Sequence, residues 1–198
     1  MAARKKSARK KLPGPQPAPR ERMVLAAVAL LSERGLSGTS FSEVIERSGA
    51  PRGSIYHHFP KGKDSLTAEA VALVGQHLLA LLRKRDGATP AEVAHRFVDA
   101  WRGVLTRSDC RAGCAIAAVA NEQAGPSKLL AQAAAVFVSW ERELEESLHA
   151  AGMPRAKARS VASLTLAAVE GALILCRARR EIAPLDSVEA ALTAFVDG

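Results

Sequence analysis

The chain has 198 residues, of which 48% are apolar and 24% charged, so it can build one sizeable core or two small ones and has the composition of a soluble globular protein. Aromatic residues make up only 4%, alanine is abundant and strand-type runs of Val, Ile and Thr are missing, which favours an all-helical fold. We expect no membrane span, no secretory signal and, from only three cysteines, a reducing cytoplasmic location.

The net charge of +8 is concentrated at the start of the chain. Residues 1–22 carry eight basic side chains and one acid, a net charge of +7, whereas the other 176 residues carry +1. Prolines at every second position from 13 to 19 forbid a helix, so the sequence predicts an extended basic arm over residues 1–19. Such an arm suits the phosphate backbone of DNA, and the alternative is a solvated tail without a role.

Residues 20–66 are expected to form a small domain of short helices. Apolar residues at helical spacing predict a first helix over residues 20–34, which ends at Gly35. Ser40 and Glu43 have the spacing of a capping box, in which each side chain bonds the backbone N–H of the other residue. A second helix is therefore expected to begin at Ser40.

Residues 48–51 predict a tight turn after this second helix. Gly49 can adopt a left-handed conformation, and Pro51 suits the first position of a third helix over residues 51–58. Residues 40–59 then have the outline of a helix-turn-helix, a unit that lays its second helix in the major groove of DNA.

The remainder, residues 67–198, is expected to be a helical ligand-binding and dimerisation domain. The sequence predicts an all-α chain of about nine helices, and those after the helix-turn-helix are expected at residues 63–85, 90–106, 115–124, 126–150, 154–180 and 184–196.

The N-terminal third resembles the TetR family of bacterial transcriptional repressors over roughly 50 residues. The residues that carry the resemblance are Met23, Val24, Ala26, Ala27, Gly35, Thr39, Ser40, Val44, Gly49, Ile55, Tyr56, His58, Phe59, Lys63 and Leu66. The connection Pro60-Lys61-Gly62 before Lys63 is longer than the family commonly has, and it is similar to the LmrA/YxaF-like branch. The later stretches CRAGCAIAAVANE and EGALILCRARREIAPLDSVEAAL also resemble that branch. The resemblance implies a homodimer with an inducer pocket in its C-terminal domain, without implying a particular ligand.

The candidate DNA contacts lie in and beside the predicted helix-turn-helix. Thr39 and Ser40 stand at a helix N-terminus, where they can bind a phosphate or act as a cap alone. Tyr56 matches the family's phosphate-contacting tyrosine, and His57 points outward as the best candidate for reading bases. The full expected set is Thr39, Ser40, Arg52, Gly53, Ser54, Tyr56, His57, Lys61 and Lys63.

Self-association is expected through the last two helices, because small residues on residues 154–180 allow a second copy to approach closely. The predicted dimer residues are Ala167, Gly171, Leu175, Val188 and Leu192. The alternative is that these side chains pack only within one chain.

A small hydrophobic or aromatic inducer is expected to bind among the helices between residues 73 and 172. The large aromatic side chains there are Phe97, Trp101, Phe137 and Trp140, and the polar pair Asn121 and Glu122 could orient a ligand. The competing interpretation makes the aromatic residues core and the polar pair surface. An inducer would shift the population toward a spacing of the two DNA-binding units that misses a palindromic operator, with the helix over residues 63–85 as the lever.

No catalytic motif, metal-ligand spacing or cofactor motif is recognisable in the sequence, so we expect no enzyme, no metal and no cofactor. Cys110 and Cys114 are compatible with a disulfide switch or, less well, a metal site, and Cys176 with a buried small side chain. Two other classes remain open: an architectural DNA-binding protein without an inducer, and an enzyme that carries a helix-turn-helix. The main hypothesis is a repressor in the bacterial cytoplasm, associated with the nucleoid when it binds its operator.

Overall fold

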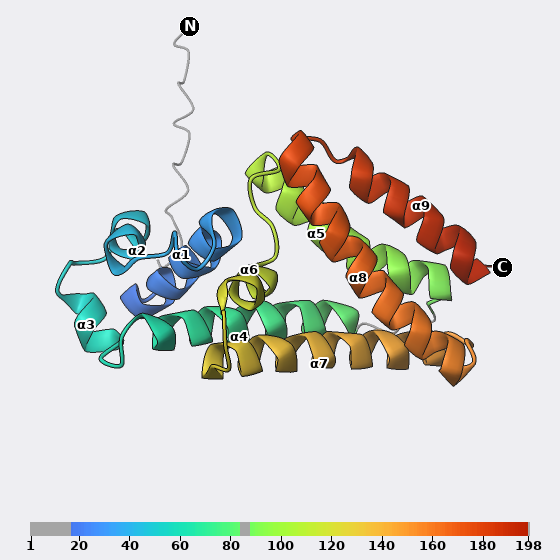
Figure 1. Cartoon of the computed structure of the whole chain (residues 1–198), viewed down its shortest axis with the longest axis horizontal. Coiled ribbons are helices and arrows are strands. Elements are labelled where there is room, and N and C mark those ends of the chain that lie inside the picture. The colour runs from blue at the N-terminus through green and yellow to red at the C-terminus, as the bar shows by residue number, and fades with distance from the viewer. Residues whose placement is uncertain (1–16, 84–87, 198) are drawn as a thin grey trace, which may run out of the picture.

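The computed structural model describes residues 17–83 and 88–197, and within these ranges the chain forms nine α-helices and no strand (Figure 1). The expected all-helical fold is confirmed for these residues. The helices are α1 (Pro19–Arg34), α2 (Phe41–Ser48), α3 (Ser54–His58), α4 (Lys63–Leu82), α5 (Pro90–Ser108), α6 (Ala115–Glu122), α7 (Lys128–Ala150), α8 (Arg155–Arg179) and α9 (Ala183–Asp197).

Helices α1 to α3 form a head at one end of the molecule, and α4 leads from this head into a larger body (Figure 1). We call residues 19–62 the head and the described residues from 63 onward the body. In the body α4 lies beside α7, α8 packs on α7, and α9 packs on α5 and α8. The short helix α6 contacts α1, α4 and α7, so it stands where head and body meet.

Two side chains of α7 donate hydrogen bonds to backbone carbonyls of α4 and so join the two helices. Gln132 Nε2 donates to the Ala68 carbonyl at 2.7 Å, and Trp140 Nε1 donates to the Gly75 carbonyl at 3.1 Å. Gly75 also allows the close approach, because a Cβ there would lie 3.0 Å from the methyl groups of Val136. One continuous helix, α4, is thus anchored at its start in the head and along its length in the body.

The core of the head consists of apolar side chains that recur at helical spacing in the sequence. Ile55 and Phe59, four residues apart, are almost fully buried together with Val44 of α2 and Leu30 and Leu31 of α1. Burial of one side chain of this size contributes about 1.5–3 kcal/mol. A helix as short as α3 is not stable alone, so this packing holds it in place.

Helix α3 begins three residues later than the sequence predicted. Pro51 suits a first helical position, but the backbone N–H and the hydroxyl of Ser54 both donate to the Pro51 carbonyl, at 2.9 and 2.6 Å. These bonds close a separate turn before the helix. The predicted end of the fourth helix at residue 85 lies outside the described residues, since residues 84–87 are not described.

The middle helices differ from the prediction at their ends by about two residues. Helix α7 begins at Lys128 rather than at residue 126, because the hydroxyl of Ser127 accepts the N–H of Leu130 and caps the helix. Helix α5 continues to Ser108, and α6 ends at Glu122 rather than at residue 124. Differences of this size are expected where only local signals mark an end.

Most of the predicted basic arm, residues 1–16, lies outside the described residues. Two basic residues counted with it, Arg20 and Arg22, belong to α1 and have partners in the fold. Arg20 pairs with Glu69, and Arg22 Nε donates to the Ser48 carbonyl at 3.1 Å. Their charges therefore serve at least partly to fix α1.

By length and composition alone, α4 and α8 are apolar enough to cross a bilayer. In the fold α4 packs against α1 and α7, and α8 packs against α7 and α9. Apolar composition of this kind is also what the core helices of a bundle require.

Candidate nucleic-acid interface

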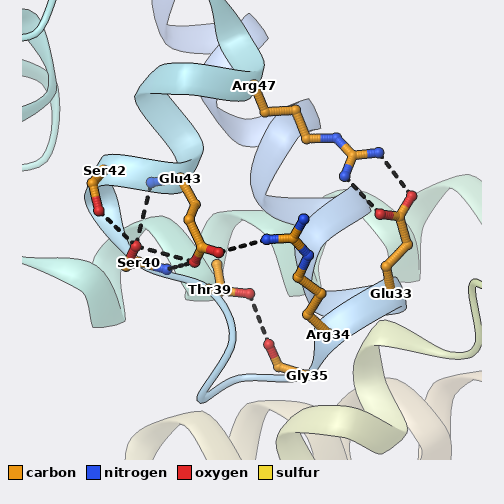
Figure 2. Close-up of polar contacts among 8 residues, drawn as sticks. All are labelled: Glu33, Arg34, Gly35, Thr39, Ser40, Ser42, Glu43 and Arg47. Atoms are coloured by element: carbon orange, nitrogen blue, oxygen red, sulfur yellow. Dashed lines mark hydrogen bonds and ion pairs between the residues drawn. The ribbon is translucent and has the colours of Figure 1, made fainter.

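The start of α2 is fixed by the capping box that the sequence predicts (Figure 2). The N–H of Glu43 donates to Ser40 Oγ at 3.3 Å, and the N–H of Ser40 donates to Glu43 Oε2 at 3.1 Å. At the other end of α2, Gly49 is left-handed with φ +62° and donates its N–H to the Ile45 carbonyl at 3.1 Å. Cap and turn together orient α2 toward α3.

Four residues of the turn and of α3 form an exposed face that we call the reading surface: Arg52, Gly53, Tyr56 and His57. Tyr56 is 67% exposed, although its ring edge packs on Phe41 with ring centroids 5.6 Å apart. A Cβ at Gly53 would meet nothing within 4 Å, so the backbone there is open to a close approach. The predicted outward orientation therefore fits the structure, while contact with DNA stays a prediction.

The structure gives three other candidate DNA contacts partners within the chain. Thr39 is only 1% exposed and donates its hydroxyl to the Gly35 carbonyl at 2.8 Å, as Figure 2 shows. Lys63 Nζ donates to the Leu36 carbonyl at 2.5 Å. The Ser54 hydroxyl donates to the Pro51 carbonyl in the turn before α3. These contacts hold the three side chains within the head, whereas Lys61 is exposed, and contact of any of them with DNA stays a prediction.

Most charged side chains around α2 are paired inside the head. Arg34 Nη1 donates to Glu43 at 2.6 Å, and Arg47 donates to both oxygens of Glu33 at 2.7 Å (Figure 2). The hydrogen bond from Arg47 lowers the pKa of Glu33, and the bonds from Ser40 lower the pKa of Glu43. Among the described residues Arg52 has no such partner, so its guanidinium is available to a phosphate or a base edge.

Three of the four aromatic residues predicted to bind an inducer form one cluster in the body. Trp101 and Trp140 meet edge to face with ring centroids 6.1 Å apart, and Phe137 meets Trp140 at 5.7 Å. Phe97 and both tryptophans are buried, and Phe137 is partly buried. Trp101 Nε1 is a buried donor without a hydrogen-bond partner in the described part of the chain. An unpaired buried donor is unfavourable and is suited to an acceptor on a ligand.

The polar pair on α6 does not point into this cluster. Asn121 is exposed, and Glu122 binds the loop between α1 and α2, where its carboxylate accepts the N–H of Leu36 and of Ser37. Glu122 thus contacts the head in this structure, and a role of the pair in orienting a ligand stays a prediction. Its partners are 85 and 86 residues away in sequence, so no local pattern could have indicated them.

The predicted dimer residues divide into two groups. Ala167, Gly171 and Leu175 are exposed on α8, whereas Leu192 is only 4% exposed and Val188 packs on the core of its own chain. Leu192 and Val188 belong to the apolar stripe of α9, a helix that packs on α5 and α8. Three further exposed apolar residues lie on α8 and α9: Leu164, Ile174 and Phe195.

All three cysteines are free and buried. Burial raises the pKa of the Cys114 thiol, and the nearby carboxylate of Glu170 raises it further. A thiol of this kind reacts slowly, because the thiolate is the reactive form. The described residues include no group of three His, Cys, Asp or Glu side chains placed to bind a metal.

A helix-turn-helix with an exposed, cationic reading surface on a separate helical body defines a DNA-binding transcriptional regulator. Comparison with known families agrees. Residues 24–70 match the family described as bacterial regulatory proteins, tetR family, and residues 90–191 match the C-terminal domain described as transcriptional regulator LmrA/YxaF-like. The chain belongs to the TetR family, in its LmrA/YxaF-like branch, whose members are regulators and not enzymes.

Two relatives and one solved structure illustrate this relationship. The chain is 42% identical to an uncharacterized HTH-type transcriptional regulator of Mycobacterium tuberculosis, over 86% of this chain and 90% of the relative. It is 28% identical to the HTH-type transcriptional regulator LmrA of Bacillus subtilis, over 84% and 90% of the two chains. The crystal structure of a TetR transcriptional regulator from Legionella pneumophila shares the fold, with a TM-score of 0.81, 23% identity and coverage of 89% and 96%.

Proposed function

We propose that the protein is a repressor that binds a palindromic operator as a homodimer and leaves it when a small apolar or aromatic inducer binds. The observation that carries this proposal is the reading surface, whose Arg52 is unpaired among the described residues and whose Gly53 is open. One such surface reads few bases, so specific binding requires two copies on two half-sites. The protein would act in the bacterial cytoplasm, on the nucleoid when bound.

The exposed apolar face of α8 supports self-association. Leu164, Ala167, Gly171, Ile174 and Leu175 follow one another at helical spacing and are all exposed. Exposed apolar patches of this kind mark interaction sites in soluble proteins. Helix α9, which lies beside α8, adds Phe195, so two helices from each copy would form the interface.

The aromatic cluster around Trp101 supports an inducer site in the body. Its unpaired indole N–H would donate to an acceptor on the inducer, and Phe97, Phe137 and Trp140 would supply apolar contact.

Selection of bound DNA from a random pool tests the first half of the proposal. A consensus with two inverted half-sites supports it, whereas binding without any consensus would favour an architectural DNA-binding protein. The second half has an internal reporter, because the only two tryptophans of the chain, Trp101 and Trp140, both belong to the cluster. An inducer should change tryptophan fluorescence and release the operator over the same concentration range. Release without a fluorescence change would place the inducer elsewhere.

A further inference from the structure

The carboxylate of Glu122 joins the body to the head at the loop between α1 and α2. Its Oε1 accepts the backbone N–H of Leu36 at 2.7 Å. Its Oε2 accepts the backbone N–H of Ser37 at 2.8 Å and the hydroxyl of Ser37 at 2.5 Å. Hydrogen bonds to a charged acceptor are roughly twice as strong as neutral ones, and here one side chain accepts three.

The neighbouring residues fit this contact closely. Gly35 has a positive φ of +77°, and a Cβ there would lie only 2.1 Å from Glu122 Oε1. Lys63, the first residue of α4, donates to the carbonyl of Leu36, which lies in the same loop. Partial burial raises the pKa of Glu122, but the bonds from Ser37 and Leu36 and the charge of Lys63 outweigh it, so the pKa is lowered overall. The carboxylate is therefore ionised at neutral pH.

The other end of α6 is anchored in the body. Ala115, Ile116 and Val119 are buried, and Cys114 caps the helix by accepting the N–H of Ala117 at 3.4 Å. A helix of eight residues is rigid and only about 12 Å long. Helix α6 therefore connects buried side chains of the body at its start to Glu122 at its end.

The loop that Glu122 binds leads directly to the DNA-reading unit. Only Gly38 and Thr39 separate Ser37 from the N-cap residue of α2, Ser40. The body also contacts the end of α1, where Gly113 donates its N–H to the Ser32 carbonyl at 2.8 Å. A shift of this loop would thus tilt α2 and α3 together.

We propose that Glu122 is a positioning residue that sets the orientation of the head on the body, so that the two heads of a dimer keep the spacing of the operator half-sites. This inference rests on the proposed binding of a palindromic operator by a homodimer. It assigns to Glu122 a role in half-site spacing, without contact to DNA or inducer.

The test compares full-length wild type with Glu122→Gln on the selected operator and on operators whose half-sites are moved one base pair closer or farther apart. Wild type should discriminate against the altered spacings. In Glu122→Gln we expect affinity for the selected operator to fall at least about fivefold. The preference for this operator over the altered spacings should shrink by a similar factor, because a less firmly oriented head binds all spacings with similar affinity. Affinity for a single half-site should change less than about twofold. Asp99→Asn, which removes an exposed charge from α5, is the matched control and should behave as wild type.

Hydrogen exchange of the Leu36 and Ser37 amides gives a readout independent of DNA. Both should exchange at least about tenfold faster in Glu122→Gln, since each loses a charged acceptor. Unchanged exchange, or equal losses on all spacings and on the half-site, would overturn the proposal. If Glu122→Gln does not fold, Ser37→Ala, which removes one of the three donors, should cause a smaller change in the same direction, and no change would be equally decisive. Failure of the proposed function is recognised separately, because wild type would then select no inverted repeat.

Discussion

The two ring side chains of the reading surface are expected to act differently on DNA. Tyr56 matches a phosphate contact, so Tyr56→Phe should weaken binding to all sequences alike, by about 1 kcal/mol or roughly fivefold. His57 is expected to meet base edges, so His57→Ala should change which bases are preferred in each half-site. Competition binding with single-base operator variants measures both. Equal factors on every sequence for both variants would show that the roles are assigned wrongly.

Glu170 of α8 makes the stability of the protein depend on pH. Burial raises the pKa of its carboxyl group to about 7, which the Cys114 thiol only partly offsets, and Oε1 has no partner among the described residues. Between about pH 4.5 and pH 7 the Glu170 carboxyl group is therefore protonated in the folded state and ionised in the unfolded state. Stability contributed at this site falls as pH rises through that window and is lowest above it.

Replacement of this carboxyl group by an amide should remove the dependence. Relative to wild type, Glu170→Gln should raise the free energy of unfolding by about 2 kcal/mol more at pH 8 than at pH 5. Urea unfolding at the two pH values would measure this difference. Glu181→Gln, on an exposed acid near the end of the same helix, is the control and should give the same change at both pH values. The same gain at both pH values for Glu170→Gln would mean that its carboxyl is not protonated in the fold.

At the scale of single residues, the sequence indicates contacts between near neighbours and misses distant ones. Ser40 and Glu43 are three residues apart, so their capping box could be predicted and is present. Lys63 and Glu122, which the sequence predicts as contacts to DNA and to an inducer, both bind the loop after α1, from 27 and 86 residues away. Such partners become neighbours only through packing, which no local pattern encodes.

At the scale of elements, the capping box fixes the start of α2, the helix before the reading surface. Ser40→Ala removes the acceptor for the Glu43 N–H and should cost about 1 kcal/mol of the free energy of unfolding. The variant should also weaken operator binding, because α2 supports the turn that presents α3. Ser139→Ala, in the middle of α7, removes a hydroxyl without a capping role and should change stability little. Urea unfolding of both variants makes the comparison.

Helix existence was predictable and the surroundings of each helix were not. Apolar spacing, a capping box and a turn predict the helices that the described residues form, but the same spacing arises whether a stripe faces its own core or another copy. Val188 and Leu192, predicted as dimer residues from this spacing, pack within the chain, and their part in a dimer stays a prediction. Pro51 gave an error at the start of α3, because the turn closed by Ser54 uses the same residue types as a helix start.

At the scale of the whole molecule, the exposed face of α8 is expected to hold two copies together. Leu175→Glu would place a charge in an apolar interface, which should raise the dissociation constant of the dimer at least about 100-fold, or ~3 kcal/mol. Sedimentation should then detect monomers with unchanged helix content. Val138→Glu, on an exposed apolar residue of α7, is the control and should leave the dimer intact. Dimers of normal affinity in Leu175→Glu would move the interface to another face.

Operator affinity should follow the same change. A monomer offers one reading surface, so Leu175→Glu should lose affinity for two half-sites while it binds one half-site as wild type does. Comparing the two affinities separates loss of dimerisation from damage to the head.

The isolation of the reading surface has a consequence for how such a protein can diverge. Among the described residues Arg52 and His57 form no hydrogen bond or ion pair with the rest of the fold, and the space beside Gly53 is empty. Replacements at these positions therefore change little in the stability of the chain. Descendants of one ancestral gene can acquire new target sequences without compensating mutations elsewhere, and an engineer can vary the same positions in a library while the scaffold stays constant.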